Sequence, residues 1–201
     1  MPDAYAFLVA GLGNPGSEYE TTPHNIGFLV IDALAAANGI RVTRKENQAL
    51  VGLGAIAGKP VVLAKPQTFM NLSGTAIKGL LERYELEPSK LIVVQDELDL
   101  PWPSMRIKSN GSAAGHNGVK SIIASTGTNE FLRVRLGIHP GHTIRNGAEY
   151  VLAPFKRGQQ KELDETVDRS REAVESIIAE GVEKAMTRFN RRAQGLNQEE
   201  E

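Results

Sequence analysis

The sequence of 201 residues contains no cysteine. Disulfide bonds, thiolate nucleophiles and zinc sites built from cysteine are therefore excluded, and a reducing compartment is compatible with this composition. Long apolar runs are also missing, because no stretch approaches the roughly 18 residues that a membrane-spanning helix needs. The first residues lack the basic region and apolar stretch of a signal peptide. We therefore expect a cytoplasmic protein without a membrane anchor.

A large excess of charge of either sign is absent as well, since the formal net charge is −1. The charges are nevertheless unevenly distributed. Between Pro101 and Ala148 the single acidic residue is Glu130, and the basic residues are Arg106, Lys108, Lys120, Arg133, Arg135 and Arg145. A basic face on a nearly neutral protein suits a partner with phosphates that docks on one side. A solvated surface on which lysine and arginine cluster by chance would give the same pattern.

Short apolar runs alternate with segments of helical periodicity along most of the chain. Buried strands are expected at 5–10, 91–94, 105–108 and 131–138, and a hairpin is expected at 50–64. Helices are expected at 26–37, 73–86 and 116–124, and a long amphipathic helix at 163–178. Thr22 and Pro23 fit the N-cap and the first position of the first helix.

This alternation predicts an α/β fold in which a mixed, mostly parallel twisted sheet is surrounded by helices. The length of 201 residues suits one domain rather than two. We expect a single domain over residues 1–194. The acidic tail at 195–201 is expected to be disordered.

Four short polar or glycine-rich segments each follow an expected strand. They are 11–16 after the first strand, 68–71 after the hairpin, 95–99 after the strand at 91–94, and 111–118 after the strand at 105–108. In open parallel sheets, ligands bind in the crevice beyond the carboxyl ends of the strands. The four segments together predict a functional site at that edge of the sheet.

Three other kinds of site fit the sequence poorly. The segment 11–16 matches the dinucleotide pattern Gly-x-Gly-x-x-Gly, but Pro15 interrupts it, no helix is expected before Thr22, and Asp32 falls inside a helix. No Gly-x-Ser-x-Gly elbow is present for a serine nucleophile. His139 and His142 lie in a turn sequence without a nearby carboxylate. We therefore expect no nucleotide cofactor, no serine triad and no metal.

His24 is the candidate general base, because a histidine side chain can accept a proton near neutral pH. Its position at a helix start favours the neutral, basic form of the ring. Asp96 could orient this ring and stabilise the imidazolium that forms when water loses a proton. Taken alone, His24 would also fit a polar surface position. The other polar side chains expected at the same edge favour the catalytic interpretation.

Several of those polar side chains are asparagines, namely Asn14, Asn71 and Asn117. Their amides both donate and accept hydrogen bonds, so they suit amide and ester carbonyls better than bare phosphates. An amide directed at a developing oxyanion would stabilise an acyl-transfer transition state. Capping a helix or closing a turn is the alternative role for such residues.

Five motifs follow one another between residues 5 and 190. They are Gly-Leu-Gly-Asn-Pro-Gly-x-x-Tyr with His24-Asn25, Lys-Pro-x-Thr-Phe-Met-Asn-x-Ser-Gly from Lys65, Asp-Glu-Leu-Asp from Asp96, Gly-His-Asn-Gly from Gly115, and Phe-x-Arg-x-Arg-x-Gly-Ile from Phe131. This series closely resembles the bacterial-type peptidyl-tRNA hydrolase family. The resemblance implies a monomeric α/β enzyme without a cofactor. Its partner would be the acceptor end and 3′ CCA of peptidyl-tRNA, and a histidine-activated water would hydrolyse the ester between the N-blocked peptide and the tRNA.

The resemblance also implies roles for individual residues. His24 would accept the proton from the attacking water, Asp96 would hold it in the basic state, and Asn14 would help to distinguish a blocked aminoacyl-tRNA from a free one. The residues expected to line the site for the peptide and the 3′ end are Tyr19, Phe69, Met70, Asn71, His116 and Asn117. Lys108 and Arg135 are expected to contact tRNA phosphates.

The sequence departs from the usual family pattern in three places. Pro23 stands where arginine is usual, Gln95 stands where histidine is common, and Asn110 and Ser112 fall in a stretch that is usually richer in glycine. These departures bear on the mobility of the loop at 109–115 and on affinity, and they leave the catalytic groups in place. The alternative function is that of a catalytically silent, RNA-binding relative with the same fold.

Overall fold

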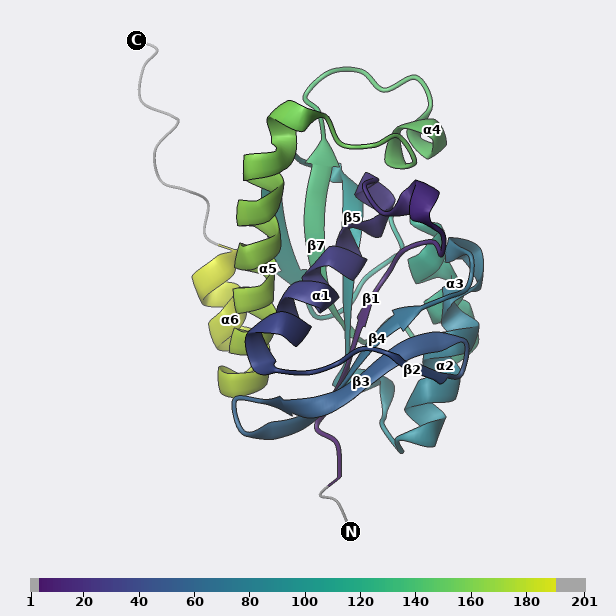
Figure 1. Cartoon of the computed structure of the whole chain (residues 1–201), viewed down its shortest axis with the longest axis vertical. Coiled ribbons are helices and arrows are strands. Elements are labelled where there is room, and N and C mark those ends of the chain that lie inside the picture. The colour runs from purple at the N-terminus through teal and green to yellow at the C-terminus, as the bar shows by residue number, and fades with distance from the viewer. Residues whose placement is uncertain (1–3, 191–201) are drawn as a thin grey trace.

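A seven-stranded sheet forms the centre of the computed structural model, which describes residues 4–190 (Figure 1). The strands are β1 (Phe7–Gly11), β2 (Arg44–Glu46), β3 (Ala49–Ile56), β4 (Lys59–Pro66), β5 (Leu91–Pro101), β6 (Ser104–Lys108) and β7 (Leu132–His139). Their order across the sheet is β2-β3-β4-β1-β5-β7-β6. The central strands β4, β1, β5 and β7 are mutually parallel, and the outer pairs are antiparallel. The predicted mixed α/β fold is therefore confirmed, with parallel pairing confined to the centre.

Helices cover both faces of this sheet (Figure 1). One face carries α1 (Ile26–Asn38), α5 (Gln160–Glu180) and α6 (Val182–Phe189), and the other carries α2 (Ser73–Arg83) and α3 (Asn117–Thr126). The short helix α4 (Gly147–Val151) lies beyond the end of the sheet (Figure 1). Of the helices in the described part of the chain, none is long and apolar enough to cross a membrane.

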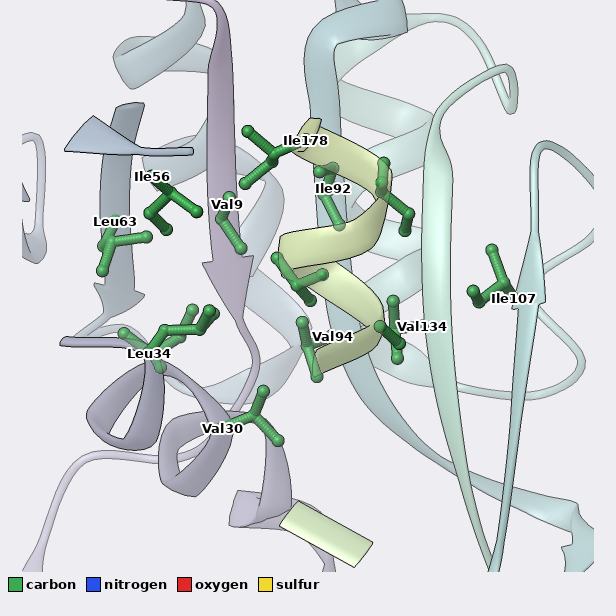
Figure 2. Packing of buried hydrophobic residues seen from close by; sticks show 14 of the residues in the cluster. Val9, Val30, Leu34, Ile56, Leu63, Ile92, Val94, Ile107, Val134 and Ile178 are labelled. Atoms are coloured by element: carbon green, nitrogen blue, oxygen red, sulfur yellow. The ribbon is translucent and has the colours of Figure 1, made fainter. Parts of the chain in front are cut away.

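Two apolar cores lie on the two faces of the sheet. Figure 2 shows part of the core beneath α1 and α5, where Val9, Val94 and Ile178 are among the fully buried side chains. On the other face, Ile77 and Val119 pack over neighbouring strand residues. The central strands are continuous apolar runs because helices cover both of their faces. Each such aliphatic side chain contributes about 1.5–3 kcal/mol through its burial.

The start of α1 packs directly on the end of β1, and two glycines permit this contact. A Cβ atom at Gly27 would lie 2.5 Å from the backbone N of Leu12 and from the carbonyl O of Val94. A Cβ atom at Gly11 would lie 2.2 Å from the carbonyl O of Gly27. The absence of both side chains brings the turn that precedes α1 to the carboxyl ends of β1 and β5.

Most element boundaries differ from the sequence-based expectation by one to three residues, and the end of β5 differs by more. β5 continues to Pro101 instead of ending at residue 94, because Gln95, Asp96 and Glu97 still pair with β7. The polar segment 95–99 therefore lies within a strand rather than after one. The second helix ends at Arg83, short of the expected residue 86. The tail expected to be disordered, 195–201, lies outside the described residues.

Candidate active site

A cleft of about 650 Å³ lies where the carboxyl ends of β1 and β4 meet β5. The predicted site residues that line it are Asn14, His24, Phe69, Met70, Asn71, Asp96, His116 and Asn117. The remaining lining comes from Glu97, Leu98 and Asp99 of β5, from Ala114 and Gly115, and from Gly147, Ala148, Val151 and Leu152 in and after α4. The four segments identified from the sequence therefore converge. Segments 11–16, 68–71 and 95–99 do so at the carboxyl ends of parallel strands. Segment 111–118 follows β6, which is antiparallel to β7, so the expectation that it follows a parallel strand is wrong; it reaches the cleft through the loop that leads into α3.

The glycine motif at 11–16 does not lead directly into an α-helix. A short 3₁₀ turn follows at Ser17–Tyr19, and α1 begins only at Ile26. Dinucleotide binding by such a motif requires a helix N-terminus at the glycines, where it meets the pyrophosphate. The local geometry therefore agrees with the expectation that this motif is not a nucleotide-binding loop.

His24 lies in the 3₁₀ turn Pro23–Asn25, immediately before α1. Thr22 and Pro23 hold the N-cap and first positions as expected, but of this turn rather than of α1, and the side chain of Thr22 accepts no capping hydrogen bond. Its hydroxyl instead donates to the carbonyl of Tyr19, at 2.8 Å. Since α1 packs against β1 and β5, this turn holds His24 over the polar end of β5.

Asp96 lies between two histidines. His24 Nδ1 is 3.0 and 2.9 Å from its two carboxylate oxygens, and His116 Nε2 is 2.8 Å from Oδ1. Asp96 is only 2% exposed. Burial by itself raises the pKa of this carboxyl group, but His116 and His24 outweigh it and hold the pKa of Asp96 well below its usual range. Asp96 is therefore an anion at neutral pH and accepts an N–H from each ring.

The N-terminus of α3 determines which nitrogen of His116 carries the proton. Nδ1 caps the helix by accepting hydrogen bonds from the backbone N–H groups of Gly118, at 3.1 Å, and Val119, at 3.3 Å. Because its lone pair is used there, the ring proton lies on Nε2 and is donated to Asp96. His24 donates its Nδ1–H to the same carboxylate. The nitrogen of His24 that remains free to act as a base is therefore Nε2.

The same three side chains have ligand atoms within 4.8 Å of one another, close enough to surround one metal ion. A metal would require the lone pair of His116 Nε2, so the ring proton would have to move to Nδ1. That proton would then face the backbone N–H groups that Nδ1 now accepts. The hydrogen bonding of α3 therefore opposes metal binding and favours proton transfer as the role of the group.

Buried hydrogen bonds fix the orientation of Asn14. Its side-chain oxygen accepts the backbone N–H of Met70, at 2.8 Å. Its own backbone N–H and carbonyl pair with the side-chain amide of Asn25, both at 2.9 Å. Because this bond turns the oxygen toward Met70, the amide NH₂ is the group that Asn14 directs at the cleft. Asn14 is therefore a hydrogen-bond donor toward a ligand.

Asn71 and Asn117 are exposed at the cleft, and neither one caps a helix. The cap of α3 is provided by His116, so Asn117 is released from that role. Among residues 4–190, neither side chain has a hydrogen-bond partner, which leaves both amides available to a ligand. Phe69 lies beside them and is 59% exposed, so it gives the cleft an apolar wall.

The basic segment is divided between surface and interior. Lys108 is exposed and Arg135 is partly exposed, and neither of them lines the cleft. Nη1 of Arg135 is 3.6 Å from the carboxylate of Glu97. Burial raises the pKa of Glu97, while the hydrogen bond from the backbone N–H of Asp99 and the charge of Arg135 act in the opposite direction. Arg133 does not belong to the predicted basic face, because it is only 1% exposed.

Tyr19 ends the turn at Ser17–Tyr19 and does not line the cleft, so its contact with a ligand stays a prediction. Conversely, sequence reasoning missed the wall formed by α4 and Leu152, which is 41% exposed. A signal for this helix was present. Asn146 accepts the backbone N–H of Glu149, and asparagine followed three residues later by glutamate is typical of a helix start.

Known proteins resemble the chain over nearly its whole length. The family model described as Peptidyl-tRNA hydrolase matches residues 8–198. A peptidyl-tRNA hydrolase of Solibacter usitatus (strain Ellin6076) is 64% identical over 194 residues, which are 96% of this chain and 99% of the relative. One from Bacillus subtilis (strain 168) is 42% identical over 183 residues, which are 91% of this chain and 97% of the relative. The crystal structure of a peptidyl-tRNA hydrolase from Acinetobacter baumannii superimposes with a TM-score of 0.86 at 33% identity, covering 93% of this chain and 95% of that one. The chain belongs to the peptidyl-tRNA hydrolase family.

Proposed function

We propose that this protein hydrolyses the ester bond between an N-blocked peptide and the 3′ end of tRNA, and releases free tRNA and peptide. Membership of the family supports this activity. The observation that carries the mechanism is the contact of His24 Nδ1 with the buried carboxylate of Asp96, which leaves Nε2 free at the cleft. The enzyme would act as a cytoplasmic monomer on the acceptor end and 3′ CCA.

The tRNA would dock on the surface beside the cleft. Lys108 and Arg135 lie on the neighbouring strands β6 and β7, where they would contact phosphates and set the register of the acceptor end. The peptide would follow the cleft past Phe69 and Met70, with Tyr19 near its entrance. This arrangement would bring the ester to the turn that carries His24.

His24 would act twice in the reaction. Nε2 first removes a proton from water, and the oxygen of that water adds to the ester carbonyl to give a tetrahedral oxyanion. Asn71 or Asn117 would donate an N–H to this oxyanion. The protonated His24 then gives its proton to the departing ribose oxygen as the C–O bond breaks. Asp96 stabilises the transient imidazolium throughout.

Selection for blocked substrates would depend on Asn14. Its NH₂ group can donate to the carbonyl of an acylated amino group, whereas a free ammonium is only a donor and cannot accept that hydrogen bond. An unblocked aminoacyl-tRNA would therefore leave a buried donor without a partner, which costs about 1–3 kcal/mol. The alternative of a silent RNA-binding relative is not favoured, because His24, Asp96 and His116 form an intact hydrogen-bonded group.

The test is the release of N-acetyl amino acid from N-acetyl-aminoacyl-tRNA, measured beside unblocked aminoacyl-tRNA. The wild type is compared with His24→Ala and with the control His142→Ala, which removes an exposed histidine in a loop. We expect cleavage of the blocked substrate by the wild type and the control, and a loss on the order of 10²–10⁴ in His24→Ala. Near-normal turnover by His24→Ala would show that His24 is not the general base. Binding of tRNA without cleavage by the wild type would support the RNA-binding alternative.

A further inference from the structure

Arg133 of β7 is a buried cation that the mechanism above does not use. It is only 1% exposed, and burial lowers its pKa, as does the nearby Arg135. Among the described residues no carboxylate forms an ion pair with it, because Glu97 pairs with Arg135 instead. Its guanidinium lies 4.5 Å from the ring centre of Phe131. A buried charge without a counter-ion is costly, so its hydrogen bonds must explain its presence.

All of those hydrogen bonds go to main-chain carbonyl groups on either side of α3. Nη1 donates to Ser112, at 2.6 Å, and Nη2 donates to Gly111 in the loop that precedes the helix. Nη2 also donates to Asn129, at 3.1 Å, in the loop that follows it. One guanidinium therefore ties both flanking loops of α3 to the central strand β7.

The loop before α3 needs such a restraint. Gly111 and Gly115 have φ angles of +126° and +80°, and Ala114 has a φ of +46°, which is rare for a residue with a side chain. This loop leads directly to His116, which touches Asp96, and to Asn117 at the cleft. Apolar packing by Val119 holds the body of α3 but does not determine the path of the chain that enters it.

We propose that Arg133 is a positioning residue for hydrolysis. It fixes the loop 111–115 and the N-terminus of α3, so that His116 meets Asp96 and Asn117 faces the ester. Arg133 also supports the contact between this loop and Lys108. A Cβ atom at Gly111 would lie only 2.7 Å from Nζ of Lys108. The planar fork of an arginine can reach carbonyls of two separate loops at once, whereas the ammonium of a lysine is a single point.

The first test compares Arg133→Lys and Arg133→Met with the control Arg171→Lys. Arg171 lies on α5, and within residues 4–190 all of its ion pairs are with acids of its own helix. Turnover of N-acetyl-aminoacyl-tRNA is measured together with the imidazole ¹⁵N signals, which are few because the chain has four histidines. We expect kcat to fall roughly 10- to 10²-fold in both Arg133 variants, as a small misplacement of a catalytic group does. We also expect the His116 signal to leave the single Nε2–H tautomer, while Arg171→Lys changes neither quantity.

A second measurement needs no variant. In the wild type, the backbone amides of residues 113–117 should exchange with solvent at least tenfold more slowly than unstructured peptide amides. Exchange at the unstructured rate would overturn the proposal, even if both variants failed to fold. Normal kcat with an unchanged His116 signal in Arg133→Lys would overturn it as well.

The inference rests on the proposed hydrolysis, and the two can fail separately. A wild type without any cleavage refutes the proposed function, whereas the His116 signal and the amide exchange still report on the loop. Cleavage by the wild type, with wild-type kcat and tautomer in the Arg133 variants, refutes only the positioning role.

Discussion

Replacing Asp96 with asparagine should inactivate the enzyme while leaving its shape intact, and the structure determines how. His116 must keep its proton on Nε2, because its Nδ1 accepts backbone N–H groups of α3. The new side chain must therefore direct its oxygen toward His116. Its NH₂ then replaces Oδ2, which lies 2.9 Å from His24 Nδ1, so that two N–H donors face each other there. The remaining oxygen, in the place of Oδ1, lies 3.0 Å from His24 Nδ1 but is already the acceptor for His116.

His24 can relieve that conflict by moving its proton to Nε2. In that tautomer the nitrogen at the cleft is a donor and cannot take a proton from water. The loss should equal the loss of the general base, on the order of 10²–10⁴ in kcat, or about 3–5 kcal/mol of transition-state stabilisation. The assay is single-turnover cleavage of N-acetyl-aminoacyl-tRNA, with imidazole ¹⁵N signals to identify the tautomer of His24.

A second substitution separates this explanation from simple loss of charge. In Asp96→Asn combined with His116→Ser, serine can still cap α3, but the introduced asparagine amide is free to turn its oxygen toward His24. We expect the double variant to be roughly tenfold more active than Asp96→Asn alone. A double variant no faster than the single one would refute the tautomer argument. So would Asp96→Asn with more than about a tenth of wild-type kcat.

Three further changes test other parts of the site. Asn14→Asp replaces the donor at the cleft with an acceptor. The preference for blocked over unblocked aminoacyl-tRNA, measured as the ratio of their kcat/KM values, should therefore fall roughly tenfold. An unchanged ratio would show that Asn14 does not select for blocked substrates. Lys108→Ala should raise KM and lower the slope of log KM against log salt by about one, with kcat unchanged; a salt slope equal to that of the wild type would contradict a phosphate contact. Glu97 has a pKa raised by burial, so its contribution to stability is present below its unfolded pKa and is lost as the pH rises through its folded pKa. Glu97→Gln should therefore increase Tm relative to the wild type more at about pH 8 than at about pH 4, and equal shifts at both pH values would count against this assignment.

Much of the fold could be predicted from local patterns. The apolar run around Val9 and the expected long amphipathic helix were confirmed as β1 and α5. Such elements can be predicted because burial of one or both faces produces a regular pattern of apolar residues in the sequence. The end of β5 could not be predicted. Asp96 is polar, and only its pairing with Leu136 of β7 shows that the strand continues.

The sequence by itself determined most of the chemical groups that meet at the cleft. Polar segments after parallel strands share one edge of the sheet, so Asn14, Asn71 and Asp96 could be brought together from the strand pattern alone. The tertiary structure was needed to bring Asn117 there, because its segment follows the antiparallel strand β6. Only the tertiary structure decided how these groups act. The donor character of Asn14 depends on the backbone of Met70, and the proton position on His116 depends on the N-terminus of α3. A side chain's identity is local, whereas its hydrogen-bonding direction is set by partners distant in the sequence, and these are known only once the chain has folded.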